Sequence, residues 1–345
     1  MKESTPLRVL QVGCGGITGA WLPPALAMND VEFVGLCDLF PAAAEKLRDK
    51  YELPPDIPIF GDLETALKEL EPDAIFDCTI PAAHTPNALL AFEHGAHVVA
   101  EKPLSQTLQD ARRALDSAQS NGEIYVVTQN YRYAPGPRRL KAFLESGAIG
   151  AITTVNSEMY LAAHFGGFRD EMQHVLLLDM AIHTFDMTRF LSGANAYSVY
   201  CHEWNPSGSW YAHDASASAI FEMSAGIVAN FRGSWCATGS PTGFQSSWRI
   251  IGERGTVLWD GAEGFRCEVE DGDEGFMRPV RAVEVPEGEW GDKAAGHGGI
   301  LREFVDAIRG GDLPETNAAD NFNSLQMVLG AVESSESGRR VELGE

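Results

Sequence analysis

Apolar and polar residues alternate in two different ways along the chain, and the pattern changes near residue 150. Before that point, short apolar runs alternate with segments in which apolar residues recur every three or four positions. This pattern indicates strands that alternate with helices. Strands are predicted at residues 7–12, 32–37, 74–78, 97–100 and 124–128, and helices at 42–51, 63–70, 86–93 and 108–120. Such alternation is typical of βαβ units with a parallel sheet and right-handed crossovers.

Proline positions refine these helices. Pro41 and Pro86 suit the first helical turn, where a missing N–H costs nothing. Pro23 and Pro24, in contrast, fall inside the helix expected after the first strand. Because proline lacks an amide hydrogen and clashes with the preceding turn, we predict that this helix is short or kinked.

After residue 150, strand-like runs follow one another with turn residues between them, which predicts an antiparallel sheet. The strands are predicted at residues 152–160, 197–204, 215–223, 227–235, 247–251, 256–259, 266–269 and 280–285, and helices at 175–191, 300–309 and 320–334. We therefore predict an α/β domain over residues 1–130 and an α+β domain over residues 131–345, whose last helices can pack back on the first domain. The cleft between two such domains is the default place for a site.

Composition and charge narrow the class of protein. The chain has 345 residues and a formal net charge of −23, which repels nucleic-acid phosphates and anionic membranes. No apolar run reaches the roughly 18 residues of a membrane span, and the start lacks the apolar core of a signal peptide. The six cysteines form no C-x-x-C pair, which favours reduced thiols. These features predict a cytoplasmic protein without a nucleic-acid or membrane partner.

A glycine-rich loop, Gly13-Cys14-Gly15-Gly16-Ile17-Thr18-Gly19, directly follows the first strand. In the dinucleotide fingerprint G-x-G-x-x-G, the first glycine makes the tight turn and the second lets the backbone approach a pyrophosphate. The third position here is Thr18, whose hydroxyl can lie near phosphate. An ordinary turn is the alternative, but the following helix N-terminus favours an anion site. We predict that the cofactor-binding residues include Gly13, Gly15, Gly16, Ile17 and Thr18.

Asp38 ends the second strand, at the position where a carboxylate binds the adenine-ribose hydroxyls of NAD. Its alternative role is the N-cap of the next helix. A carboxylate there repels a 2′-phosphate, and the neighbouring Leu39 and Phe40 offer no cation to bind one. We therefore predict a Rossmann domain that binds NAD in preference to NADP, with Asp38 and Leu39 beside the cofactor.

Two further motifs are Glu101-Lys102-Pro103, after the strand at 97–100, and Asp179-Met180-Ala181-Ile182-His183, within an apolar helix. Together with the glycine-rich loop, they resemble the Gfo/Idh/MocA family, which includes glucose–fructose oxidoreductase and inositol dehydrogenases. Residues 79–84, 130–132, 304–311 and 334–341 are also similar to that family. One departure is His174-Val175-Leu176-Leu177-Leu178, where many members have a glycine-rich stretch. For this reason the identity of the substrate does not transfer.

The resemblance implies an NAD-binding Rossmann domain and a second domain with a large, mostly antiparallel sheet. It also implies homodimers or homotetramers that pair through this sheet. Further cofactor contacts are expected from Thr79, Pro81, His84, Glu101, Lys102 and Asn130. His84 either lies near the nicotinamide or caps the helix at Pro86.

The motifs also fit the chemistry of alcohol oxidation. The carbon of an alcohol gives up its hydride only as the hydroxyl proton leaves, so the site needs a base and a cation near the same oxygen. Lys102 can stabilise the developing charge, and His183 titrates near neutrality. Asp179, one helical turn earlier, can bind a neighbouring hydroxyl or orient His183. The resemblance implies these catalytic roles, and which of Lys102 and His183 is the formal base is open.

Each of these residues could also have a role outside catalysis. Lys102 could lie on the surface, and Asp179 with His183 could be a buried structural pair. The same pair could bind a metal, but no third ligand is evident, so no metal site is predicted. Additional substrate-binding candidates, each equally compatible with a structural role, are Arg132, His164, Arg169 and His174.

The sequence thus predicts an NAD-dependent dehydrogenase that oxidises a hydroxyl of a sugar, inositol or related polyol. One alternative is a glycosidase that recycles NAD. The other is a non-catalytic, NAD-linked sensor, which need not keep Lys102, Asp179 and His183 together.

Overall fold

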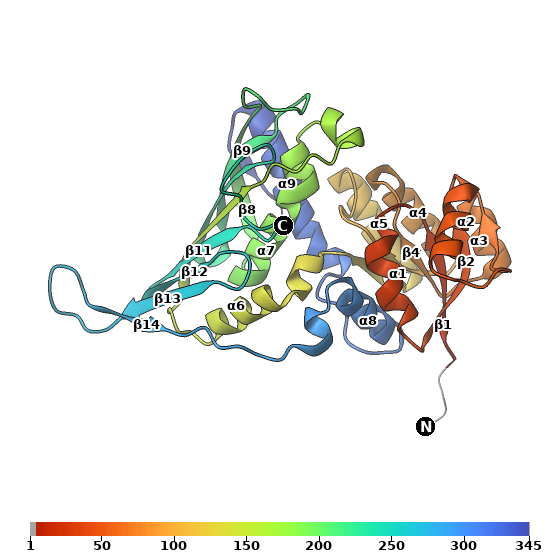
Figure 1. Cartoon of the computed structure of the whole chain (residues 1–345), viewed down its shortest axis with the longest axis horizontal. Helices are drawn as coiled ribbons and strands as arrows, with labels where there is room; N and C mark the ends of the chain where they lie inside the picture. The colour runs from red at the N-terminus through yellow and green to blue at the C-terminus, as the bar shows by residue number, and fades with distance from the viewer. Residues whose placement is uncertain (1–4, 345) are drawn as a thin grey trace. The chain divides into compact units, whose positions relative to one another are not determined.

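The structure is a computed structural model that describes residues 5–344; residues 1–4, part of the polar segment before the first strand, lie outside this range. The chain forms two compact units, drawn in Figure 1. The first contains the residues up to Tyr133 together with Ala295–Phe322. The second contains Ala134–Ala294 and the residues from Asn323 onward.

The first unit is built on a six-stranded parallel sheet with the order β3-β2-β1-β4-β5-β6. Its strands are β1 (Leu7–Val12), β2 (Val31–Cys37), β3 (Ile59–Phe60), β4 (Ala74–Asp77), β5 (His97–Ala100) and β6 (Tyr125–Val127). This is the order of the doubly wound dinucleotide-binding fold, whose ligands bind at the carboxyl ends of the strands. The predicted Rossmann-type domain is confirmed, although the two-residue β3 was not predicted.

The helices of the first unit are α1 (Thr18–Leu26), α2 (Pro41–Lys50), α3 (Leu63–Leu70), α4 (Pro81–Glu93), α5 (Leu108–Asn121) and α8 (His297–Ile308), with the 3₁₀ turn η1 (Asn130–Tyr133). Helix α1 is short and contains Pro23 and Pro24, as predicted. The predicted start of α4 at Pro86 is wrong. The helix begins at Pro81, which occupies the first turn, and it accommodates Pro86 in its interior.

Helix α8 completes the core of the first unit although it is distant in sequence from the sheet. Trp21 of α1 and Phe304 of α8 both contact Phe76 of β4, with ring centroids 5.8 and 6.2 Å apart. All three side chains are fully buried. Burial of large aromatic side chains contributes about 2–3 kcal/mol each, so α8 is part of what stabilises this unit.

The second unit is built on a nine-stranded sheet with the order β14-β13-β12-β11-β7-β10-β9-β8-β15. Its strands are β7 (Ile152–Tyr160), β8 (Ala196–Trp204), β9 (Ser216–Met223), β10 (Val228–Ser234), β11 (Ser247–Gly252), β12 (Gly255–Trp259), β13 (Phe265–Glu270), β14 (Val280–Val283) and β15 (Val341–Glu342). The mostly antiparallel sheet is confirmed, but β7 and β10 pair in parallel. This parallel pair is compatible with the prediction of a mostly antiparallel sheet.

Helices cover one face of this sheet (Figure 1). They are α6 (Pro135–Glu145), the π-helical segment η3 (Leu176–Ala181), α7 (Ile182–Ser192) and α9 (Ala318–Ser337). The second unit also contains the 3₁₀ turns η2 (Gly167–Glu171), η4 (Ser224–Gly226) and η5 (Gly291–Ala294). Phe185 of α7 packs edge-on against Phe221 and Phe231 of the sheet. The single helix predicted at 175–191 is instead a π-helical segment followed by an α-helix, and α6 was not predicted.

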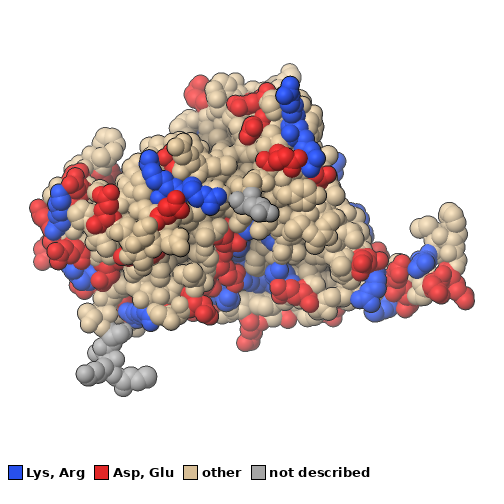
Figure 2. Space-filling view, turned by 180° about the vertical axis from the view of Figure 1, so that it is seen from behind, with Lys and Arg blue, Asp and Glu red and all other residues tan. Residues whose placement is uncertain are grey.

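The surface mixes charges of both signs. On the face drawn in Figure 2, Lys and Arg side chains are interspersed among the more numerous Asp and Glu side chains. Among the described residues, no helix is both long enough and apolar enough to cross a membrane.

Candidate functional site

The glycine-rich loop is fixed between the ends of β2 and β4. Gly13 has a φ of +77°, and a Cβ atom on it would lie 2.8 Å from the carbonyl of Cys78 and from the nitrogen of Thr79. Its own N–H donates to the Cys37 carbonyl at 2.8 Å. Only glycine fits both the space and the backbone conformation, so Gly13 makes the tight turn that the motif predicts.

Beyond Gly13 the loop is open. Cβ atoms placed on Gly15 and Gly16 would meet nothing within 4 Å, and Ile17 is exposed. The Thr18 hydroxyl is buried and donates to the Gly15 carbonyl at 2.5 Å, so it closes the loop. An exposed loop at the N-terminus of α1 matches what a dinucleotide pyrophosphate requires, and these residues fit NAD.

Asp38 is held at the end of β2 by two backbone donors. Its Oδ2 accepts from the N–H of Cys14 and its Oδ1 from the N–H of Phe40, each at 2.8 Å. The N-cap of α2 is Phe40, so the alternative role of Asp38 as the N-cap is wrong. A carboxylate oxygen accepts more than one hydrogen bond, and Asp38 keeps capacity for ribose hydroxyls. Leu39 beside it is 81% exposed.

His84 joins the loops that follow β4 and β5. The ring is fully buried, with Nδ1 2.7 Å from the Pro103 carbonyl and Nε2 3.1 Å from the Thr79 carbonyl. Since α4 begins at Pro81 with Ile80 as its N-cap, His84 does not cap this helix. Its position indicates that it fixes the backbone around Thr79 and Pro103.

Glu101 connects the end of β5 to two helices. Its Oε1 accepts from the Trp21 indole at 2.7 Å and lies 3.6 Å from His297 Nε2, and its Oε2 accepts from the Lys102 N–H. Burial opposes ionisation, but hydrogen bonds from His297 and Trp21 and the charges of His297 and Lys102 lower the pKa of Glu101 to about 2. Glu101 is therefore an ionised structural group directly next to the half-buried Lys102.

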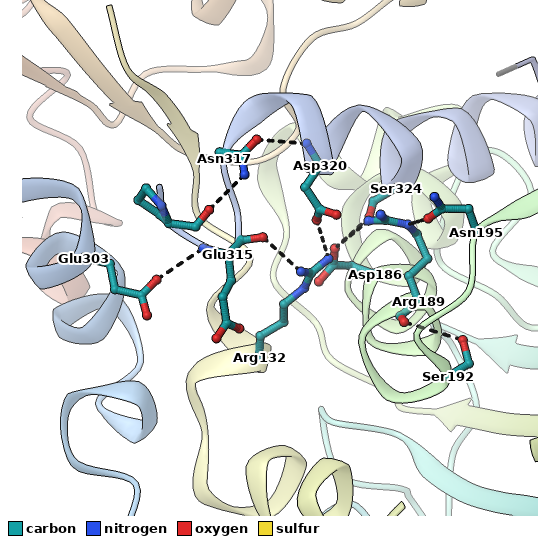
Figure 3. A network of polar contacts seen from close by, with 11 residues as sticks. Arg132, Asp186, Arg189, Ser192, Asn195, Glu303, Glu315, Asn317, Asp320 and Ser324 are labelled. Carbon is teal, nitrogen blue, oxygen red and sulfur yellow. Dashed lines mark hydrogen bonds and ion pairs between the residues drawn. The ribbon is translucent and has the colours of Figure 1, made fainter. Parts of the chain in front are cut away.

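Arg132 is a buried structural residue of the first unit. Its Nη1 donates to the Glu315 carbonyl at 3.1 Å and its Nη2 to Asp320 Oδ2 at 2.8 Å (Figure 3). These bonds favour the structural role over the substrate contact for Arg132. Asn130, a predicted cofactor contact, opens η1 and is half-buried.

Asp179 and His183 lie in the second unit, where η3 passes into α7. They are 7% and 6% exposed, respectively. The segment packs closely on β10, because a Cβ atom on Gly233 of β10 would lie 3.2 Å from the Leu176 side chain of η3. π-Helical turns occur frequently at functional sites, and this one presents the Asp179 carboxylate.

Asp179 forms a bidentate ion pair with Arg169. Arg169 Nε donates to Oδ2 at 2.7 Å and Nη2 to Oδ1 at 3.2 Å. The Arg169 guanidinium also lies 5.2 and 4.7 Å from the ring centroids of Phe165 and Phe168. This ion pair joins η2 to η3. It could not be predicted from the spacing of acidic and basic residues along the chain.

The other two substrate-contact candidates differ in their surroundings. His164 is exposed and stacks on Trp210, with ring centroids 3.6 Å apart. His174 Nδ1 lies 2.7 Å from the buried carboxylate of Glu203, and Nε2 lies 3.4 Å from Glu336. The hydrogen bond to Glu203 raises the pKa of His174 against the opposing effect of burial. His174 therefore connects the start of η3 to β8 and α9.

Other buried charges in the second unit are structural. Ser324 donates to Asp186 at 2.7 Å and accepts from Arg189 at 2.9 Å, and Arg189 also donates to Asn195 at 2.8 Å (Figure 3). Each buried polar group has a partner in this network, as buried polar side chains require.

The first unit thus gathers the glycine-rich loop, Asp38, Thr79 and Lys102 near the carboxyl ends of its strands, and the second brings Arg169 to Asp179. That Lys102 and His183 act on one substrate oxygen remains a prediction.

Two family models match most of the chain. The model described as "Oxidoreductase family, NAD-binding Rossmann fold" matches residues 7–129, and the model of the GFO/IDH/MocA C-terminal domain matches residues 138–258.

Similar proteins span the whole chain. The uncharacterized protein y4oX of Sinorhizobium fredii is 28% identical over 98% of this chain and 96% of its own length. The D-glucoside 3-dehydrogenase of Escherichia coli is 24% identical over 99% of this chain and 98% of its own. An oxidoreductase from Agrobacterium radiobacter, solved in complex with NAD+, L-tartaric acid and magnesium, has the same fold with a TM-score of 0.85 at 20% identity, over 99% of both chains.

Proposed function

The chain belongs to the GFO/IDH/MocA family of oxidoreductases, and on that premise we propose that it oxidises a hydroxyl group of a sugar, inositol or related polyol. NAD, held by the glycine-rich loop and Asp38, supplies the hydride acceptor when bound. The products are NADH and a ketone or, from a hemiacetal hydroxyl, a lactone. The full-length similarity to a D-glucoside 3-dehydrogenase supports a sugar-like substrate.

The observation that carries this proposal is the pair Asp179 and His183, buried and four residues apart where η3 passes into α7. A buried carboxylate and a buried imidazole on one continuous helical segment suit general base catalysis better than a passive surface role. Asp179 is already held by Arg169, so its carboxylate is oriented before substrate arrives.

In the proposed mechanism, the catalytic residues have different roles around one substrate oxygen. Lys102 donates a hydrogen bond to this oxygen and stabilises the negative charge that develops on it. As the carbon gives up its hydride, the hydroxyl proton passes to His183; in the alternative assignment the Lys102 amine takes this proton and then faces the oxygen as the charge-stabilising ammonium. Asp179 orients His183 or binds the neighbouring hydroxyl, which places the reacting carbon.

We also propose that copies of the chain pair through the open face of the second-unit sheet. Tyr200 of β8 and Ile220 of β9 are cross-strand partners and are 46% and 48% exposed, and Trp204 on β8 is 42% exposed. Exposed apolar patches of this kind often mark interfaces. The cytoplasm is the proposed compartment, which is supported by six free cysteines among the described residues.

The test of the proposed function is direct. Purified protein is given NAD and a panel of sugars and cyclitols, and nicotinamide absorbance is followed. Lys102→Ala and His183→Ala should each lower kcat about 10²–10⁴-fold, because each removes a proton-transfer or charge-stabilising group. NAD binding, measured by calorimetry, should be retained.

Lys46→Ala and His94→Ala are matched controls outside the proposed site, in α2 and at the end of α4, and should keep full activity. Three results contradict the proposal. Aglycone release from aryl glycosides without net NADH indicates a glycosidase that recycles NAD. Tight NAD binding without turnover indicates a sensor. Unchanged kcat in both variants removes Lys102 and His183 from the mechanism.

A further inference from the structure

We propose that the second unit carries a subsite for the part of the substrate beyond the ring that is oxidised, so that the substrate is a neutral glycoside and not a free monosaccharide. The subsite consists of Phe165, Phe168 and Arg169, here called the aromatic arm, together with Trp235 and Asp170. This inference rests on the proposed function, because it takes Asp179 as the group next to the reacting carbon.

The arm presents aromatic surface to solvent. Phe165 is 55% and Phe168 63% exposed, although phenyl side chains usually pack inside. The Phe165 ring stacks on the fully buried Trp235 ring, with centroids 5.7 Å apart and planes at 27°. Exposed aromatic faces that are backed by a buried ring bind flat apolar surfaces, such as the C–H face of a pyranose or an aryl group.

Two polar atoms of the residues assigned to this subsite lack protein partners among the described residues. Trp235 Nε1 and Asp170 Oδ1 are buried and make no hydrogen bond within the described part of the chain. Buried polar atoms are normally paired, so each of these two calls for a partner from outside. An indole N–H only donates and a carboxylate only accepts, whereas a sugar hydroxyl does both. Carbohydrate is the ligand chemistry that uses both groups and the aromatic faces.

Arg169 connects the arm to the proposed reaction site. Its Nε and Nη2 hold Asp179, and its Nη1 makes no hydrogen bond within residues 5–344. A guanidinium nitrogen with unused N–H groups can donate to a ligand oxygen. Because Arg169 bonds Asp179 and also lies 5.2 and 4.7 Å from the two phenyl centroids, a glycoside whose sugar ring is held at Asp179 can place its aglycone against the rings.

The arm is held in place by its neighbours, and its charges favour a neutral ligand. The Tyr211 hydroxyl donates to the Ala163 carbonyl at 3.3 Å, and the Ala212 N–H donates to the Asp170 carbonyl at 2.8 Å. The positive charge of Arg169 is balanced by Asp179, and Asp170 adds a negative charge. Acidic or phosphorylated glycosides are therefore disfavoured.

The experiment compares matched ligands. Glucose, galactose and mannose are each used as the free sugar, the methyl glycoside and the phenyl glycoside. Dissociation constants are measured by calorimetry on the full chain with NADH bound, so that no oxidation occurs. For the preferred sugar, the phenyl glycoside should bind about tenfold more tightly than the free sugar, as expected for one aromatic contact.

Phe165→Ala and Phe168→Ala should each reduce this preference several-fold, and the double variant should abolish it. Both residues are exposed, so folding should be retained. Phe276→Ala is the matched control, because Phe276 is fully exposed on the loop between β13 and β14. Trp235→Phe, which removes the indole N–H together with part of the bicyclic ring, should weaken binding of both glycosides.

Equal affinity for free sugar and phenyl glycoside in the wild type overturns the subsite, as does a preference unchanged in the double variant. A change in oligomeric state of the double variant, with the preference intact, assigns the rings to an interface instead. The proposed function is tested separately by turnover with NAD. Turnover without a glycoside preference removes only the subsite, whereas a preference lost in the variants without turnover of any sugar removes only the proposed function.

Discussion

The loop around Gly13 and the segment around Asp179 achieve their geometry in opposite ways. The loop is positioned by backbone atoms, since Gly13 donates to the Cys37 carbonyl and Asp38 accepts from two main-chain N–H groups. Asp179 is positioned by side chains, through the Arg169 ion pair and the close packing of η3 on Gly233. A site built from backbone tolerates change in its side chains but not in its glycine. A site built from side chains depends on each partner.

The largest effect is expected from Gly13→Ala. The new methyl group would meet the backbone of Cys78 and Thr79 at 2.8 Å, and the φ of +77° strains any other residue. We expect a loss of about 1–3 kcal/mol in the free energy of unfolding and at least a tenfold loss of NAD affinity. Urea unfolding and calorimetry measure the two quantities.

Gly61→Ala is its matched control, because a Cβ atom there meets nothing within 4 Å. It should change neither quantity. Full NAD affinity in Gly13→Ala would show that the loop does not depend on its backbone geometry, and the comparison between the two regions would fail.

A smaller effect, confined to the second unit, is expected from Arg169→Met. Removal of the guanidinium leaves the buried Asp179 without its bidentate donor, which costs about 1–3 kcal/mol of stability. We expect kcat/KM for the sugar substrate to fall by about 10²-fold through misplacement of the carboxylate. NAD affinity should stay within twofold of the wild type.

Arg169→Lys sharpens this test, because lysine keeps the charge but cannot form the bidentate pair. It should recover only part of kcat/KM. Full recovery by lysine would mean that charge alone matters, and that the geometry of the pair does not position Asp179.

The smallest effect is a pH dependence at His174. Its hydrogen bond to Glu203 raises its pKa in the folded state, so the pair stabilises the protein fully below the unfolded value near 6.5 and loses this contribution as pH rises through the folded pKa. His174→Gln should lower the free energy of unfolding at pH 5.5 by up to about 1.5 kcal/mol. The difference from the wild type should shrink by pH 9.

Urea unfolding across this pH range measures the effect. Glu336→Gln removes the carboxylate of the more distant partner, 3.4 Å from His174 Nε2. Its destabilisation relative to the wild type should also be larger at low pH than at high pH, but by less than that of His174→Gln. A difference between wild type and His174→Gln that grows with pH would contradict the assignment.

The features that the sequence predicted correctly are those fixed by local backbone preferences, as in the loop around Gly13. Strand β1 and the glycine-rich loop were predicted at their observed positions, because contiguous residues and local backbone preferences determine them. Helix α6 was missed because Pro135, Gly136 and Pro137 suggest a loop. The first turn of a helix tolerates these residues, and the buried Leu140, Phe143 and Leu144 then form its apolar face.

Features that depend on tertiary contacts could not be predicted from the sequence pattern. The π-helical geometry of η3 depends on how closely it packs on β10, and the parallel pairing of β7 with β10 depends on the order of the whole sheet. Arg169 was a candidate substrate contact, but its pairing with Asp179 joins side chains ten residues apart on two irregular turns. No periodicity along the chain encodes such a contact.

The packing of α8 against Trp21 and Phe76 has a practical consequence. A fragment that ends at Tyr133 would contain every strand of the parallel sheet but would leave these rings exposed to water, since Ile300, Leu301 and Phe304 belong to the same core. Isolating the nucleotide-binding half, or exchanging it between relatives, therefore requires residues 295–322 to be carried along, through a linker or as a separately expressed peptide.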